Sequence, residues 1–111
     1  MGTEKLVADI LWRAERLKII QILSKGPSPL SALRETVGGS FSSLLHHLRA
    51  LQRAGLVDVV KLKPRLTVAY LKFDVTLSFE SGSEPVVRLK PRPPPAESEL
   101  MMAYWRLLVK K

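Results

Sequence analysis

One segment of the 111-residue chain, from residue 40 to residue 53, carries side chains that could make specific polar contacts with a partner. On a helical wheel its hydroxyl, imidazole and guanidinium groups gather within about 60° of one another. These groups belong to Ser42, His46, Arg49 and Arg53. The opposite side of the wheel carries three leucines, Leu44, Leu48 and Leu51. The pattern therefore predicts a helix with one core face and one face suited to hydrogen bonding with an anionic or polar surface.

A second group of basic residues lies where a β-hairpin is predicted. Residues 56–62 and 66–73 are rich in Val, Leu, Tyr and Thr and flank the tripeptide Lys63-Pro64-Arg65. Together with Lys61, this tripeptide places three positive charges at the hairpin tip. Residues 40–73 hold six basic side chains and one acidic side chain, a local net charge of +5 in a chain whose total is +8. Charge of this sign and density favours a phosphate backbone as the partner, because each contact releases counterions.

The elements that position these residues follow from helical periodicity and from glycine and proline stops. Residues 3–24 predict a helix with a break near Arg13, ended by Gly26 and the proline that follows it. A short second helix is expected to begin with Ser28 as its N-cap and Pro29 at the first helical position.

The third helix has clear stop and start signals. Gly38-Gly39 ends the second helix, and Ser40 is expected to cap the third, which runs to about Arg53 and is closed by Gly55.

Beyond the hairpin, the chain alternates between apolar and polar residues. Residues 75–79 predict a strand that continues the hairpin or kinks away from it, and residues 86–90 predict a return strand. The prolines of residues 91–95 predict an extended spacer. A last helix is expected over residues 96–110.

This order of elements predicts an α+β fold, a winged helix-turn-helix domain that spans residues 1–111 as a single unit. It has a three-helix core, a β-hairpin wing, an extra β segment and a C-terminal helix. In such a domain the third helix places its N-terminal residues in the major groove of double-stranded DNA, and the basic wing follows the backbone or minor groove. Arg49 could pair with guanine, whereas Arg53 is expected to meet phosphate. The predicted DNA-binding residues are Ser40, Ser42, Ser43, His46, Arg49, Arg53, Lys61, Lys63 and Arg65.

The stretch over residues 17–73, about half of the chain, resembles the ArsR-type winged-helix repressors and, more loosely, MarR and other archaeal winged-helix regulators. The most specific matching string is His47-Leu48-Arg49-Ala50-Leu51-Gln52-Arg53-Ala54-Gly55-Leu56-Val57. Further matches are Leu17-Lys18-Ile19-Ile20-Gln21-Ile22-Leu23 before Gly26-Pro27, and Ala69-Tyr70-Leu71 in the wing. The resemblance implies that Ser42, Ser43, His46 and Arg49 lie on a base-contacting surface. It also implies that His47 is packed or hydrogen-bonded near the helix turn.

The sequence departs from this family in several places. Leu45 stands where the family has a small polar residue, so it could meet a thymine methyl group or pack against the core. The chain has no cysteine, so the family's cysteine metal site is missing. His46 and His47 point about 100° apart on a helix and cannot share one ion, so no metal site is expected.

The C-terminal helix predicts a homodimer. Its apolar residues cover about 220° of the wheel, which implies burial on two sides. The alternative is a helix that crosses its own domain and leaves Trp105 exposed. The N-terminal helix, residues 3–13, is a second candidate for pairing. The expected interface residues are Leu6, Ile10, Leu100, Tyr104, Trp105 and Leu108.

Composition excludes several classes of function. Only three aspartates occur, the two histidines are adjacent, and no glycine-rich phosphate loop or Gly-x-Ser-x-Gly motif is present, so neither an enzyme nor a cofactor is predicted. No apolar run approaches the roughly 18 residues of a membrane span, and Glu4 and Asp9 argue against a secretory signal. A cytoplasmic protein is expected, and the lack of asparagine favours a thermophilic source.

Two functions fit these observations. The first is a sequence-specific transcriptional regulator that binds double-stranded DNA as a homodimer, its effector and its sign of regulation left open. The second is an architectural or protein-contact subunit of transcription or replication machinery with non-specific nucleic-acid binding. A specificity ratio on the order of 10³ or more over random duplex separates the two.

Overall fold

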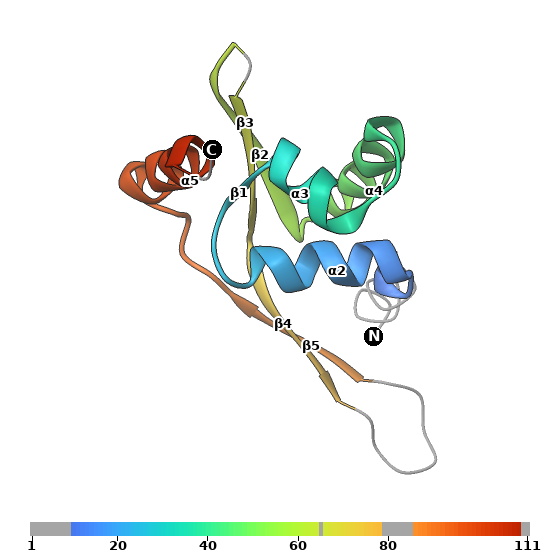
Figure 1. Cartoon of the computed structure of the whole chain (residues 1–111). Helices are drawn as coiled ribbons and strands as arrows, with labels where there is room; N and C mark the ends of the chain where they lie inside the picture. Colours follow the sequence, from blue (N-terminus) through green and yellow to red (C-terminus); the bar gives the residue numbers. More distant parts are fainter. Residues whose placement is uncertain (1–9, 65, 79–85, 110–111) are drawn as a thin grey trace.

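The computed structural model describes residues 10–64, 66–78 and 86–109, apart from the side chains of Tyr104 and of residues 106–109 (Figure 1). The elements, in chain order, are α2 (Ala14–Leu23), β1 (Ser28–Pro29), α3 (Leu30–Val37), α4 (Phe41–Arg53), β2 (Val57–Lys63), β3 (Leu66–Leu71), β4 (Phe73–Ser78), β5 (Val86–Pro91) and α5 (Glu97–Val109). The described part of the chain is therefore an α+β fold with the predicted order of helices and hairpin.

A three-stranded antiparallel sheet in the order β1-β3-β2 separates two layers of helices. Helices α2, α3 and α4 lie on one side of it and α5 lies on the other (Figure 1). Side chains of β3 alternate between the two layers, as expected for a pleated strand. Leu66 and Val68 pack with Leu100 of α5, whereas Ala69 and Leu71 belong to the core beneath α2–α4. One central strand thus contributes to both hydrophobic cores.

The predicted helix boundaries at the glycines are confirmed. Gly38 and Gly39 have φ angles of +84° and +81°, a region that L-residues with a side chain rarely adopt. The Ser40 hydroxyl oxygen then accepts a hydrogen bond of 3.1 Å from the backbone N–H of Ser43, which satisfies one of the free donors at the start of α4. The predicted break near Arg13 is also present, since Arg13 is extended with φ −137° and ψ 138°.

The predicted cap at Ser28 is wrong. Ser28 and Pro29 form the short strand β1, which pairs with Ala69 and Val68 of β3, and α3 begins only at Leu30. Two effects favour this outcome: a residue that precedes proline is disfavoured in the helical region, and an extended Ser28 can pair with a strand that lies far away in sequence. The Ser28 hydroxyl donates to the carbonyl of Pro29 at 3.1 Å and caps nothing.

The extra β segment forms a second sheet. Strands β4 and β5 pair with each other in an antiparallel register that runs from Phe73↔Pro91 to Ser78↔Val86. This hairpin extends away from the β2–β3 hairpin (Figure 1). Its apolar side chains, Phe73, Val75, Leu77, Val87 and Leu89, belong to or pack against the core beneath α2–α4. The segment is therefore part of the core of the domain, and the kink that the sequence allowed falls at Lys72.

Arg92 ties the proline-rich spacer to the rest of the domain. Its two terminal nitrogens donate to the carbonyl oxygens of Leu23 (3.2 Å) and Ser24 (2.9 Å), at the negative end of α2. Its Nε lies 2.9 Å from an oxygen of Asp74 in β4. The Arg92 guanidinium thus connects α2, β4 and the chain that leads into α5.

We expect Arg92→Ala to lower the free energy of unfolding by about 1–2 kcal/mol, because two carbonyl oxygens and a carboxylate lose a shared donor. Urea denaturation measures the change. Arg88→Ala is the matched control, since Arg88 is an exposed basic residue of β5, and it should change stability by less than about 0.5 kcal/mol. Equal effects of the two substitutions would contradict this role for Arg92.

Candidate nucleic-acid interface

Helix α4 has the two faces that its sequence predicts. Its buried residues are Leu44, His47, Leu48 and Leu51. The predicted contact residues Ser42, Ser43, His46, Arg49 and Arg53 are all exposed, as is the capping residue Ser40. The structure therefore brings this part of the predicted site together on one solvent-facing side of a single helix.

The basic hairpin lies beside this helix. Lys61 and Lys63 are exposed near the end of β2, and the hairpin tip projects beyond the helices (Figure 1). The register of β2 against β3 shifts between Lys61 and Lys63, which marks a bulge just before the tip. Lys61 pairs across the strands with Thr67. Arg65, the third predicted basic residue of the tip, lies outside the described residues.

Asp58 connects α4 to the base of the hairpin. Its Oδ1 accepts hydrogen bonds from the backbone N–H of Val59 (2.8 Å) and from the side chain of Gln52 in α4 (3.5 Å). Its Oδ2 accepts one from the Tyr70 hydroxyl of β3 at 3.3 Å. Burial and the neighbouring Asp58 carboxylate raise the pKa of Tyr70, so the phenol remains a donor. Sequence reasoning missed this role, although Asp58 is the one acidic residue in residues 40–73, which hold six basic residues.

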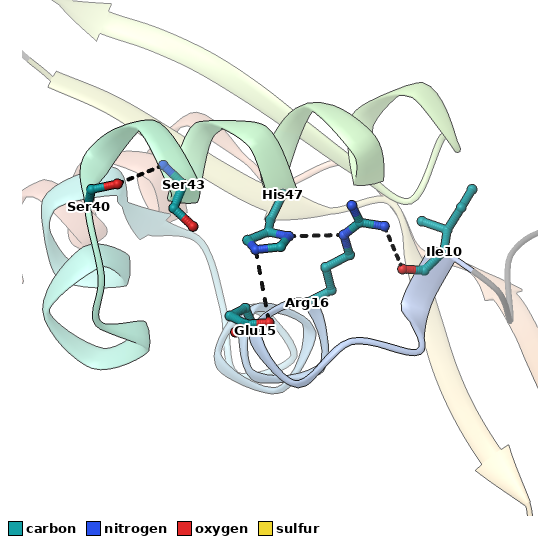
Figure 2. A network of polar contacts seen from close by, with 6 residues as sticks. All are labelled: Ile10, Glu15, Arg16, Ser40, Ser43 and His47. Atoms are coloured by element: carbon teal, nitrogen blue, oxygen red, sulfur yellow. Dashed lines mark hydrogen bonds and ion pairs between the residues drawn. The ribbon is translucent and has the colours of Figure 1, made fainter.

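A second polar network holds the other flank of α4 (Figure 2). Arg16 of α2 is only 7% exposed, and its Nε donates to Nδ1 of His47 at 3.1 Å. Its Nη1 donates to the carbonyl oxygen of Ile10 at 2.9 Å. Because Nδ1 accepts this bond, the imidazole proton sits on Nε2, which lies 4.0 Å from Oε2 of Glu15. His47 is therefore hydrogen-bonded between two helices, and Arg16 is a partner that the sequence did not reveal.

The pKa of His47 is lowered from its ordinary value of 6.5. Burial is the main cause, followed by the positive charge of Arg16, and these outweigh the opposing effect of Glu15. Arg13 and His46 add small effects in the lowering direction. The neutral imidazole is thus the form that the fold favours.

Leu45 is half-buried and packs against the core beneath α2–α4, which favours the packing alternative over contact with a base. The described residues contain no group of three His, Asp or Glu side chains that could hold a metal ion. Among the same residues, no helix has both the length and the apolar character that a membrane span requires.

The predicted pairing residues lie on different sides of their elements. Trp105 is 59% exposed on α5, whereas Leu100 packs on the sheet of its own chain and is 9% exposed. Ile10 is half-buried against the core. Leu6 lies outside the described residues, as do the side chains of Tyr104 and Leu108.

Three helices packed on a small sheet, a capped helix with an exposed basic face and an adjacent basic hairpin define a winged helix-turn-helix domain. Residues 14–60 match the model of a family described as a helix-turn-helix domain. This match covers α2, α3, α4 and the first half of β2. A comparison with curated proteins finds no match.

Several solved structures share the fold. HlyU from Vibrio cholerae N16961 is 24% identical, with a TM-score of 0.59 over 63% of this chain and 75% of its own. Mb0332 from Mycobacterium bovis, described as a homodimeric winged helix-turn-helix DNA-binding domain and a possible ArsR-family regulator, is 16% identical, with a TM-score of 0.56 over 97% and 78%. Rv0081 from M. tuberculosis is 19% identical, with a TM-score of 0.55 over 99% and 92%. The chain thus shares the winged helix-turn-helix fold of these structures, the fold that its sequence predicts.

We expect the fold to lose stability as the pH falls below about 6.5. The pKa of His47 is lower in the folded than in the unfolded chain, so below the ordinary value the unfolded state binds more protons. The stabilisation is complete above that pH and is lost as the pH falls through the folded pKa. Thermal unfolding between about pH 5 and pH 8 measures it.

The variant His47→Asn tests the assignment, because a side-chain amide oxygen can still accept from Arg16 but does not titrate. Its unfolding temperature should depend less on pH than that of the parent protein. His46→Asn is the control, since His46 is exposed on the same helix and is one of the lesser causes of the lowered pKa of His47, and it should keep most of the parent pH dependence. A parent-like pH profile for His47→Asn would refute the role of His47.

Proposed function

We propose that this protein is a sequence-specific transcriptional regulator that binds double-stranded DNA as a homodimer. The exposed polar and basic face of α4 would enter the major groove, and the basic β2–β3 hairpin would follow the backbone or minor groove. The observation that carries the proposal is the exposure of Arg49 and its neighbours on one side of a capped helix, with Lys61 and Lys63 exposed on the hairpin beside it.

The roles of the residues follow from their positions. Arg49 lies two turns into α4 with its guanidinium on the exposed side, where it can donate two hydrogen bonds to guanine O6 and N7. Ser42, Ser43 and His46 precede it and are suited to base edges or phosphates. Arg53, at the last residue of α4, is suited to phosphate.

Pairing of two copies of the chain through α5 would arrange their two α4 helices about a two-fold axis. Met101, Met102 and Trp105 are 40%, 50% and 59% exposed on the side of α5 that faces away from the sheet. Large apolar side chains grouped in this way are typical of an interaction surface. A homodimer is also the form named for the similar domain Mb0332. A dimer of this kind reads two half-sites about 34 Å apart, one turn of DNA, hence a pseudo-palindromic operator.

Selection of duplexes from a random pool tests the proposal directly. At about 0.15 M salt, where non-specific binding is weak, we expect a two-fold motif with half-sites about 10 base pairs apart. Absence of a motif, with binding that collapses as salt rises, would instead favour an architectural or machinery subunit.

Arg49→Ala should reduce binding to the selected duplex by about 1–3 kcal/mol and random duplex far less, because it removes base contacts. Lys61→Ala should weaken both duplexes alike and lower the slope of log K against log salt by about one, because it removes a phosphate contact. Fluorescence anisotropy titrations over a salt series measure both effects. Equal losses for Arg49→Ala on cognate and random duplex would count against base reading.

Trp105→Asp should shift the protein from dimer to monomer, because a charge replaces the most exposed of the large apolar side chains that the structure describes in α5. Sedimentation velocity measures the mass. Phe41→Ala is the control: it removes an exposed aromatic residue from α4, which lies on the other side of the sheet from α5, and should leave the dimer intact. A Trp105→Asp protein that stays dimeric would place the interface elsewhere.

A further inference from the structure

Phe41, the first residue of α4, is a large apolar side chain that the core does not use. It is 42% exposed, and it precedes the exposed Ser42 and Ser43. A single exposed aromatic residue is ordinary on a protein surface. The position of this one, at the N-terminal end of the helix proposed to read DNA, makes it relevant to recognition.

Phe41 also lines an open groove of about 530 Å³ between α3, the start of α4 and strand β3. The far wall of this groove is formed by Leu66 and Thr67 of β3, and Thr67 pairs with Lys61 across the hairpin. Phe41 therefore lies between the exposed face of α4 and the basic hairpin, the two surfaces proposed to contact one duplex. A DNA helix in contact with both surfaces would therefore come close to Phe41.

The side chains that line the groove carry no net charge, so its walls themselves do not attract an anionic partner. Arg34 and Glu35 of α3 line it together and offset each other, while Lys61 of the hairpin and Arg49 further along α4 are exposed but do not line it. The groove is otherwise apolar or neutral beside Phe41. Its contribution to binding is thus expected to come from apolar contact and shape, with charge contacts made by the flanking elements.

A phenyl ring cannot read hydrogen-bond donors or acceptors. The apolar feature that the major groove offers is the C5 methyl group of thymine. Leu45, the other apolar residue that the sequence offers for such a contact, is half-buried against the core. Phe41 is the side chain that remains free to make it.

We propose that Phe41 is a specificity-determining residue that contacts the methyl group of a thymine at one position of each half-site. This inference rests on the proposed function, because it requires that α4 enter the major groove.

The test uses the full chain and the selected duplex, in which each thymine is replaced in turn by uracil, a change that removes only the methyl group. For the parent protein we expect a loss of affinity of about fourfold at one thymine per half-site, the effect of one methyl group withdrawn from an apolar contact. Phe41→Ala should bind the thymine and uracil duplexes equally. Phe41→Leu should recover part of the preference, since it restores an apolar side chain.

Ser31→Ala is the matched control, because it alters an exposed residue of the same groove that is not among the proposed DNA contacts and leaves Phe41 in place. It should keep the full preference for thymine. Two results would overturn the inference but not the proposed function. One is a parent protein whose affinity does not change at any replacement, and the other is a Phe41→Ala protein that keeps the preference for thymine. A second copy or another protein seated on Phe41 would give this same indifference to uracil. A selection that returns no motif is a different result, since it overturns the proposed function together with the inference.

Discussion

The buried guanidinium of Arg16 is the constraint on which the placement of α4 depends. Arg16 is only 7% exposed, and a buried charged side chain must be hydrogen-bonded, a need that it meets with the carbonyl of Ile10 and Nδ1 of His47. The first bond holds the chain where it breaks before α2, and the second holds the inner flank of α4. Loss of the His47 imidazole would leave the Nε donor of the buried guanidinium without a partner, so this bond favours one arrangement of α2 and α4.

Asp58 performs the corresponding task on the flank of α4 that faces the sheet. Through Gln52 and Tyr70 it links the last turn of the helix to both strands of the hairpin. Helix α4 is thus held on two sides by polar contacts and from below by its leucines, which leaves one face exposed in a fixed direction. Contacts with base edges need such preorganisation, because a small error in orientation loses the hydrogen bond.

The features that could be predicted from sequence are those with local causes. Gly38-Gly39 and Ser40 mark the start of α4 because backbone freedom and side-chain capping act within a few residues. The cap at Ser28 was predicted on the same grounds and is wrong, because pairing with β3 is not local. Likewise, the family resemblance implies a packed or hydrogen-bonded His47 but could not identify its partner Arg16, which lies 31 positions away in sequence. The paired residues of a network are set by the tertiary fold, and one sequence contains no signal for them.

Helices α4 and α5 lie on opposite sides of the sheet, so one small domain could have two separate binding surfaces. Helix α5 packs on one side of β3 through Leu100, while α4 lies on the other side (Figure 1), and its Arg49 and Arg53 are exposed. A second copy docked on Trp105 would leave that basic face uncovered, because the sheet separates the two surfaces. Since Val68 and Ala69 are adjacent in β3 yet belong to opposite cores, a shift of α5 would act on a strand that also supports the helices. The same strand therefore separates α4 from α5 and contributes to the packing of both layers.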